Sequence, residues 1–286
     1  MKTILVLTDF TKAAQRAADM ALIVAGKLKA DILLLNSFVT VPVIPSDEAA
    51  NWQVQDYFIV RDVSNDNLDK EKKRLERQLK KTFFEPGQPT IRVECDYGSV
   101  VENTKKVLGK HSVSLIMMGG REKDDMPFLF GDTIKAIINH IKRPVLVVPS
   151  KTNIEKLHNA TFATDLEDVD LRALNDLGKL SKALHFNIHV AHVSEPVLVP
   201  DFREEKAVTH FRERVMALGL NNVSYHALRG DDIGDQLEKF NHSTHADLIA
   251  MVHQKHSFWW GIFNERPCQE MITHHHIPVL IYPEHH

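Results

Sequence analysis

The chain carries the same ordered series of landmarks twice, and this duplication limits its possible folds more than any other feature. The first copy opens with an apolar run that ends in Thr8-Asp9, and the second with a run that ends in Thr164-Asp165. Each copy closes on an apolar segment bracketed by prolines, at 144–149 and at 278–283. A series repeated in the same order indicates one fold unit present twice.

The spacing of the landmarks places the boundary between the copies. Asp9 and Asp165 lie 156 residues apart, whereas Gly98 and Gly230 lie 132 apart, so the first copy has a longer segment around residues 40–65. A short polar stretch at 150–157 separates the copies, and 286 residues suit two domains. We therefore predict one domain at residues 1–150 and another at 155–286.

Within each copy, two hydrophobic periods alternate along the chain. Continuous apolar runs such as Ile4–Leu7 are typical of strands buried on both faces of a parallel sheet. Stripes with three- and four-residue steps, as from Ala14 to Leu28, are typical of amphipathic helices. The longer segment reads as an irregular Pro-containing stretch at 41–45 followed by a helix from Asp62 to about Phe84. The alternation predicts a doubly wound parallel α/β sheet with right-handed crossovers.

Composition narrows the function classes. A net charge of −3 gives no basic field for nucleic acid. The longest apolar runs are strand-sized, far below the roughly 20 residues of a membrane helix. Two cysteines, one per copy, favour a reducing compartment, so we expect a cytoplasmic protein without nucleic-acid or membrane partners. The C-terminal His285-His286 receives no functional weight because it could belong to a tag.

The ordered landmarks resemble those of the universal stress protein A family, in both copies. They are an Asp after the first strand, a Gly before the third helix, Met118-Gly119 after the fourth strand, Gly131 before the last helix and the proline-bracketed terminal strand. The resemblance implies two tandem five-stranded parallel-sheet domains of the adenine nucleotide α-hydrolase-like kind. It also implies that the terminal strands pair to form an intrachain pseudo-dimer, which would cover an apolar edge prone to aggregation. A further homodimer and an unidentified protein partner are the other associations expected.

The resemblance also implies a nucleotide site in the first copy. ATP-binding members carry Gly-x-x-Gly-x(9)-Gly-Ser/Thr after strand four, where glycine backbones and a helix N-terminus hold phosphate. Here Glu122 replaces the second glycine, and Asp124 and Asp125 would repel a triphosphate. The loop is therefore either a site for ATP or another adenine nucleotide, with Mg²⁺ only if ATP binds, or a tight turn that begins a helix. The candidate ligand contacts are Thr8, Asp9, Phe10, Asn36, Gly119, Gly120, Gly131, Asp132 and Thr133.

The second copy is expected to have a degenerate site. Its equivalent loop keeps only Gly261, out of register, and Phe258, Trp259 and Trp260 would block close approach of phosphate. These aromatic residues are expected to pack within the chain or on a partner. Asp9 could either orient a nucleoside or N-cap the following helix, and for Asp165 the cap is favoured.

No other chemistry stands out in the sequence. The 17 histidines form no metal motif, and His189 and His192 face opposite sides of a strand, so no metal site is expected. No nucleophile elbow or Walker loop occurs, and neither Cys95 nor Cys268 has an evident base, so no catalytic residue is assigned. The predicted function is a stress-response regulatory binding protein. The alternatives are a weak ATP-hydrolysing enzyme of the same superfamily and a ligand-free interaction scaffold.

Overall fold

The computed structural model describes residues 2–39, 49–82, 88–120, 131–155, 157–194, 202–254 and 276–284, with only the backbone for 49–55, 82 and 203–204. Its strands in the first half are β1 (Thr3–Leu7), β2 (Asp31–Phe38), β3 (Ile91–Tyr97), β4 (Val113–Gly119) and β5 (Val145–Val148). Those in the second half are β6 (Asn159–Ala163), β7 (Asn187–Ser194), β8 (Val223–Arg229), β9 (Leu248–His253) and β10 (Val279–Pro283).

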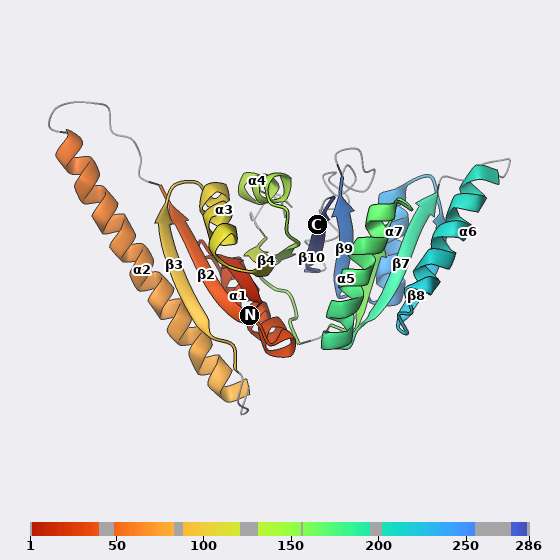
Figure 1. Cartoon of the computed structure of the whole chain (residues 1–286), viewed down its shortest axis with the longest axis horizontal. Helices are drawn as coiled ribbons and strands as arrows, with labels where there is room; N and C mark the ends of the chain where they lie inside the picture. The colour runs from red at the N-terminus through yellow and green to blue at the C-terminus, as the bar shows by residue number, and fades with distance from the viewer. Residues whose placement is uncertain are drawn as a thin grey trace.

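The described strands form one ten-stranded sheet in the order β3-β2-β1-β4-β5-β10-β9-β6-β7-β8, which runs across Figure 1. Within each half, neighbouring strands are parallel. At the centre, β5 and β10 pair antiparallel with Leu146 opposite Leu280. The predicted fold of two tandem doubly wound halves, joined through their terminal strands, is confirmed. The boundaries at 150 and 155 remain a prediction.

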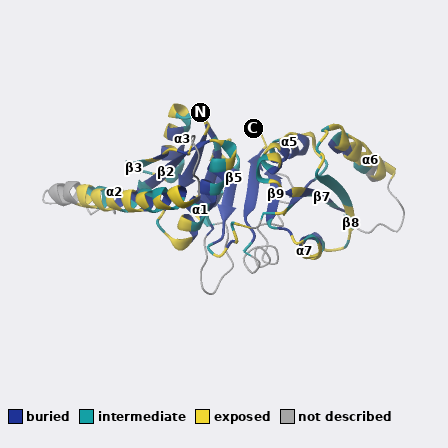
Figure 2. Cartoon of the chain, turned by 90° about the horizontal axis from the view of Figure 1, so that it is seen from below, coloured by how far each residue is buried: buried dark blue, intermediate teal, exposed yellow. Residues whose placement is uncertain are grey.

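Helices cover both faces of the sheet. The helices are α1 (Lys12–Leu28), α2 (Ala49–Thr82), α3 (Val100–Lys110), α4 (Asp132–His140), α5 (Asp168–Leu184), α6 (Phe202–Ala217) and α7 (Ile233–Thr244). One core cluster joins the sheet to α1, α2, α5 and α6, and the other joins it to α3, α4 and α7. The inner strands between these layers are buried, whereas the edge strands β3 and β8 are mostly half-buried (Figure 2). None of the helices in the described ranges is long and apolar enough to span a bilayer.

The prediction for the second helix was wrong at its start. α2 begins at Ala49, not Asp62, and the segment 41–45 lies outside the described residues. Phe58, Ile59 and Val63 are exposed, so the apolar residues in the early part of α2 do not form a single inward stripe. Sequence periodicity therefore detects only the later part of the helix, where Leu68, Leu75 and Leu79 are buried.

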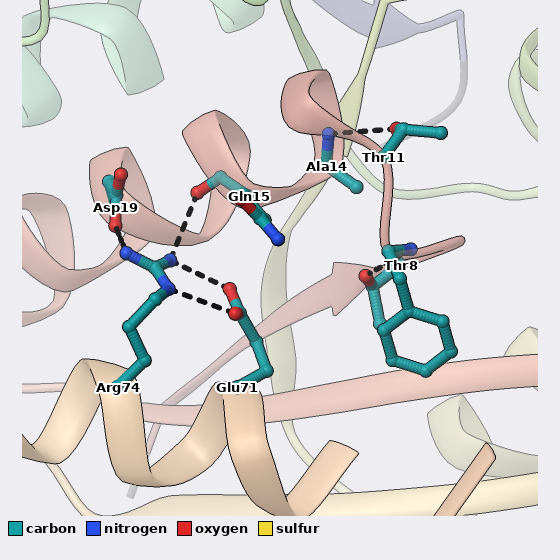
Figure 3. A network of polar contacts seen from close by, with 8 residues as sticks. Thr8, Thr11, Ala14, Gln15, Asp19, Glu71 and Arg74 are labelled. Atoms are coloured by element: carbon teal, nitrogen blue, oxygen red, sulfur yellow. Dashed lines mark hydrogen bonds and ion pairs between the residues drawn. The ribbon is translucent and has the colours of Figure 1, made fainter. Parts of the chain in front are cut away.

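Arg74 links α2 to α1 through hydrogen bonds, as Figure 3 shows. Its guanidinium donates to both carboxylate oxygens of Glu71, at 2.9 and 2.7 Å, and to Asp19 at 2.6 Å. A fourth hydrogen bond reaches the Gln15 carbonyl at 3.4 Å. Glu71 is buried, and removing its carboxylate from water is unfavourable. The bidentate pair with Arg74 offsets this cost.

We expect Arg74→Met to lower the free energy of unfolding by about 2 kcal/mol, because it leaves the buried Glu71 carboxylate without its partner. The matched control is Arg77→Met, one turn further along α2, where the exposed side chain donates to the Lys73 carbonyl. The control should change stability by less than about 0.5 kcal/mol in urea unfolding. Equal effects of the two variants would contradict the role given to Arg74.

Candidate functional site

The order of the strands defines where a ligand would bind in each half. In the first half it reverses between β1 and β4, and open α/β sheets bind ligands at the carboxyl ends of the strands at such a reversal. Thr8 and Asp9 follow β1, and Gly119 and Gly120 lie at the end of β4. The structure therefore brings these four predicted residues to one edge of the sheet, with Asn36 on neighbouring β2.

Thr8, Phe10 and Asn36 build the turn after β1. The Asn36 side-chain amide donates to the Thr8 carbonyl at 2.8 Å, and the Phe10 amide donates to Thr8 Oγ1 at 3.1 Å. Phe10 has a φ of 65°, in the left-handed region, and these bonds hold it there. Thr8 and Asn36 are buried, so their side chains position the turn rather than face a ligand.

Asp9 is exposed at the tip of this turn. Its Oδ1 accepts from the amide of Thr11 at 3.1 Å and from the Thr11 hydroxyl at 2.6 Å. The N-cap of α1 is Thr11, whose Oγ1 accepts from the Ala14 amide at 3.3 Å. Asp9 itself is therefore not the cap. It supports the cap through one oxygen, and Oδ2 has no hydrogen bond within the described part of the chain.

The two glycines at the end of β4 are needed for packing and pairing. A Cβ on Gly119 would lie 2.4 Å from the Ala13 carbonyl carbon and the Ala14 nitrogen, so only glycine lets α1 approach β4 here. The amide of Gly120 donates to the Val148 carbonyl at 2.8 Å. The Gly120 amide is therefore used in a hydrogen bond of the sheet, and Gly119 is required for the packing of α1 on β4.

Gly131, Asp132 and Thr133 open α4. Gly131 is its N-cap and provides no side-chain acceptor, so the first-turn amides keep their partial positive charge. Asp132 and Thr133 are exposed in that turn, and the Asp132 carboxylate opposes the approach of phosphate. The connecting residues Glu122, Asp124 and Asp125 lie outside the described residues.

The second half repeats the backbone geometry of the turn with different side chains around it. Leu166 matches Phe10, with a φ of 67°, and its amide donates to Thr164 Oγ1 at 3.0 Å. His192 stands where Asn36 stands, with Nδ1 3.0 Å from the Thr164 carbonyl. The reversal of strand order now falls between β6 and β9. The loop with Phe258, Trp259, Trp260 and Gly261 lies outside the described residues, as does Cys268.

Asp170 makes the decisive difference between the two turns. One of its oxygens, Oδ2, accepts from the Thr164 hydroxyl at 2.7 Å and from the amides of Asp165 and Glu167 at 3.1 and 3.2 Å. Asp170 is 2% exposed, and burial raises its pKa to about 7. The residue at the matching position of the first half is Ala14. The second turn is thus filled by a carboxylate of its own helix, and the first is not.

This arrangement corrects the expectation for Asp165, which does not cap the helix. Glu167 is the N-cap residue of α5, and Asp165 contributes its backbone amide to Asp170. Sequence reasoning missed Asp170 itself. The available signal was an acidic residue three positions after Glu167 at the start of a helix, a spacing from which a side chain reaches back to the preceding amides.

Two pockets among the described residues lie elsewhere. One has a volume of about 210 Å³ and lies beside the end of α7, lined in part by His242, His245 and Asp247. A second, of about 400 Å³, lies along α7. Neither is lined by a predicted site residue, so the candidate site rests on the geometry of the turns.

The fold defines a tandem α/β protein whose doubly wound halves are joined edge to edge, each with its own switch point. A family model described as the universal stress protein family matches residues 1–149, and the chain belongs to that family. A universal stress protein from Archaeoglobus fulgidus superimposes with a TM-score of 0.70 at 17% identity, covering 98% of this chain and 96% of that one. A functionally unknown protein from Pseudomonas aeruginosa gives 0.57 at 13%, covering 98% and 92%. These likenesses concern the fold. No curated protein matches the chain.

Proposed function

We propose that this universal stress protein binds one adenine nucleotide at the switch point of its first half and acts by association with a protein partner in the cytoplasm. The observation that supports this proposal is the contrast between the two turns. In the first half, Asp9 is exposed and accepts from Thr11 through one oxygen, and α1 has no acidic residue in its first turn that could turn back. In the second half, Asp170 of α5 turns back and accepts from the Thr164 hydroxyl and from the amides of Asp165 and Glu167.

The described residues suggest how the nucleotide is held. Asp9 Oδ2 accepts a hydrogen bond from the adenine amino group or a ribose hydroxyl. The amides at the start of α4 face the phosphates, and their partial positive charge favours an anion. Because Asp132 carries a negative charge in the same helical turn, ATP binds with Mg²⁺, whereas AMP has less need of it.

The proposal assigns no catalytic step to this site. Asp9 is tied to Thr11 through one oxygen, and the buried Thr8 and Asn36 are engaged with the backbone of the turn. A hydrolase would need a group that positions an attacking water beside the phosphates. Asp132 and Thr133 are exposed in the first turn of α4, and we assign them binding roles rather than a catalytic one.

Isothermal titration with ATP, ADP and AMP tests the proposal, and one molecule bound per chain is expected. Asp9→Asn should weaken binding by about tenfold, the loss of one hydrogen bond to a charged acceptor. The matched control is Asp165→Asn, at the equivalent position of the second half, which should leave the affinity unchanged. Ala14→Asp copies the Asp170 carboxylate into the first turn and should reduce binding at least as much as Asp9→Asn.

Other outcomes would overturn the proposal. Absence of heat with all three nucleotides would leave the interaction scaffold as the function. Conversion of ATP to ADP above a buffer blank, lost in Asp9→Asn, would make the chain an enzyme. Weaker binding in Asp165→Asn with no effect of Asp9→Asn would move the site to the second half.

A further inference from the structure

The outward side of α2 is exposed at one end of the molecule. The helix lies outside β3 in Figure 1, and its inward side, with Leu68 and Leu79, is buried against the rest of the first half. On the outward side, Ile59 and Val63 are 56% and 55% exposed, and neighbouring Phe58 is 45% exposed. Contiguous exposed apolar side chains of this kind mark an interaction surface.

Charged residues on the outward side of α2 are segregated along the helix. Residues at alternating steps of three and four from position 56 fall on one stripe, and all of them are exposed. The stripe is acidic and apolar before Leu68 and wholly basic after it, with Asp69 at its margin. We call the following residues the outer stripe: Asp56, Ile59, Val63, Asp66, Lys70, Lys73, Arg77 and Lys80.

The helix dipole does not account for this segregation. Acidic side chains are favoured near a helix N-terminus and basic ones near its C-terminus, but the effect falls off within the first or last turn. Asp66 lies 17 residues after Ala49, the first residue of α2, and Lys70 lies 12 residues before Thr82, the last. None of the ion pairs within the described part of the chain involves Asp66, Lys70 or Lys80. These charges are therefore free to pair with a partner.

We propose that the outer stripe binds the outer stripe of a second copy of this chain, with the two α2 helices antiparallel about a two-fold axis near Leu68. A two-fold interface brings the same patch of both copies together, so the patch must be complementary to itself. A stripe that is acidic at one end and basic at the other meets this condition only when the helices run antiparallel. Nucleic acid is disfavoured as the occupant, because Asp56 and Asp66 on the same stripe would repel its phosphates.

Antiparallel pairing about this axis places opposite charges together. Residues equally far before and after Leu68 face each other, so Asp66 faces the partner's Lys70 and Asp56 faces the partner's Lys80. Each pair occurs twice because of the symmetry. The overlap from position 56 to position 80 is about 36 Å of helix, at a rise of 1.5 Å per residue. Charge complementarity over this length fixes the direction and the register of the two helices.

The apolar residues of the outer stripe are covered in the same arrangement. Val63 faces the partner's Lys73 and Ile59 faces the partner's Arg77, and the aliphatic stems of such side chains cover apolar surface while their charged ends stay in water. Alternating steps of three and four give the 3.5-residue period of a left-handed two-helix seam, so the contact continues along the stripe. Arg77→Met keeps an apolar stem opposite Ile59 and should therefore leave the dimer in place.

Sedimentation equilibrium of the full-length protein over a series of concentrations tests the proposal. The wild type should show a reversible monomer–dimer equilibrium that weakens when NaCl is raised from about 0.1 to about 0.5 M. Ile59→Lys should weaken dimerisation by at least about tenfold, because the lysine would face the partner's Arg77. Ile59→Glu should weaken it by less than about threefold, because it presents the opposite charge to the same arginine. The matched control, Met216→Lys, changes a 66% exposed apolar residue of α6 and should have no effect.

An exchange of charges tests the register. Asp56→Lys should weaken the dimer, and Asp56→Lys/Lys80→Asp should restore it. These positions lie 24 residues apart on one helix, so a contact within a single chain cannot cause the recovery. Circular dichroism of each variant verifies that α2 stays folded. A folded double variant that fails to recover would overturn the proposed pairing.

Three further results would overturn the proposal. The first is a wild type that remains monomeric at every concentration. The second is equal weakening by lysine and glutamate at position 59, which would mean that the helices run parallel, with position 59 beside its own copy. The third is a dimer unaffected by either substitution, which would place the interface elsewhere on the chain. Because α2 supplies none of the predicted nucleotide contacts, this inference and the proposed function can fail separately.

Discussion

Replacement of Gly119 by alanine should lower the free energy of unfolding by about 3 kcal/mol, at the upper end of the usual range for overpacking a core. The added Cβ would lie 2.4 Å from backbone atoms of Ala13 and Ala14, and 2.8 Å from Cβ of Ala13. Backbone atoms at the start of α1 cannot turn aside as a flexible side chain can. The helix must therefore move away from β4 and lose contacts with the sheet. Urea unfolding monitored by circular dichroism measures the effect.

Gly109 provides the matched control. It lies within α3, and a Cβ there would meet nothing within 4 Å. Gly109→Ala should stabilise the protein by about 0.5–1 kcal/mol, because alanine favours the helix and restricts the unfolded chain. Equal stability changes in the two variants would show that α1 does not approach β4 as described. The same packing role means that nucleotide affinity in Gly119 variants cannot be assigned to the loss of a phosphate contact.

Removal of the Asp170 carboxylate should have a similarly large effect. Asp170→Ala leaves the Thr164 hydroxyl and the amides of Asp165 and Glu167 without their common acceptor. We expect the free energy of unfolding to fall by about 3 kcal/mol at about pH 5. At this pH Asp170 is protonated in the folded protein, so the substitution does not also remove an unfavourable buried charge. At about pH 4, where both forms are neutral in the folded state, Asp170→Asn retains an acceptor oxygen and should stay within about 1 kcal/mol of the wild type.

The raised pKa of Asp170 gives a pH dependence with a defined sign. Burial raises the pKa to about 7 in the folded protein, against about 3.9 in an unfolded chain. Between these values the folded state retains the proton and the unfolded state has released it. The free energy of unfolding therefore falls as pH rises from about 4 to 7, by up to about 1.4 kcal/mol per pH unit from this group, and then levels off.

The comparison with Asp170→Asn isolates this group from the others that titrate. Urea unfolding across this pH range gives the free energy of unfolding of the wild type and of Asp170→Asn. The difference between the two values should grow with pH and level off above about 7, because the asparagine cannot ionise. A constant difference over the same range would mean that Asp170 is already ionised in acid. The carboxylate would then be stabilised by its three donors more strongly than it is penalised by burial.

The elements of the fold were largely predictable because parallel strands buried on both faces produce continuous apolar runs. The pairing of β5 with β10 was expected from the family resemblance, and the proline-bracketed terminal segments marked the two strands concerned. The early part of α2 was missed because its exposed Phe58 and Ile59 do not follow one helical stripe. Helix length in such a segment depends on tertiary contacts that periodicity does not contain.

The site was predictable only in position. Asp9 and Asn36 could be placed at the switch point from the end of each strand, but their roles depend on contacts made after folding. Asp170 was missed for the same reason. Whether a carboxylate turns back into its own loop is decided by how the chain enters the helix rather than by residue type.

Photolabelling with an 8-azidoadenine nucleotide, followed by peptide mapping, tests most directly the claim that only the first half takes a nucleotide. The account predicts labelling of peptides from the carboxyl ends of β1 and β2, around Asp9 and Asn36, competed away by unmodified nucleotide. Competable labelling around Asp165 and His192 instead, with the first half unlabelled, would contradict it.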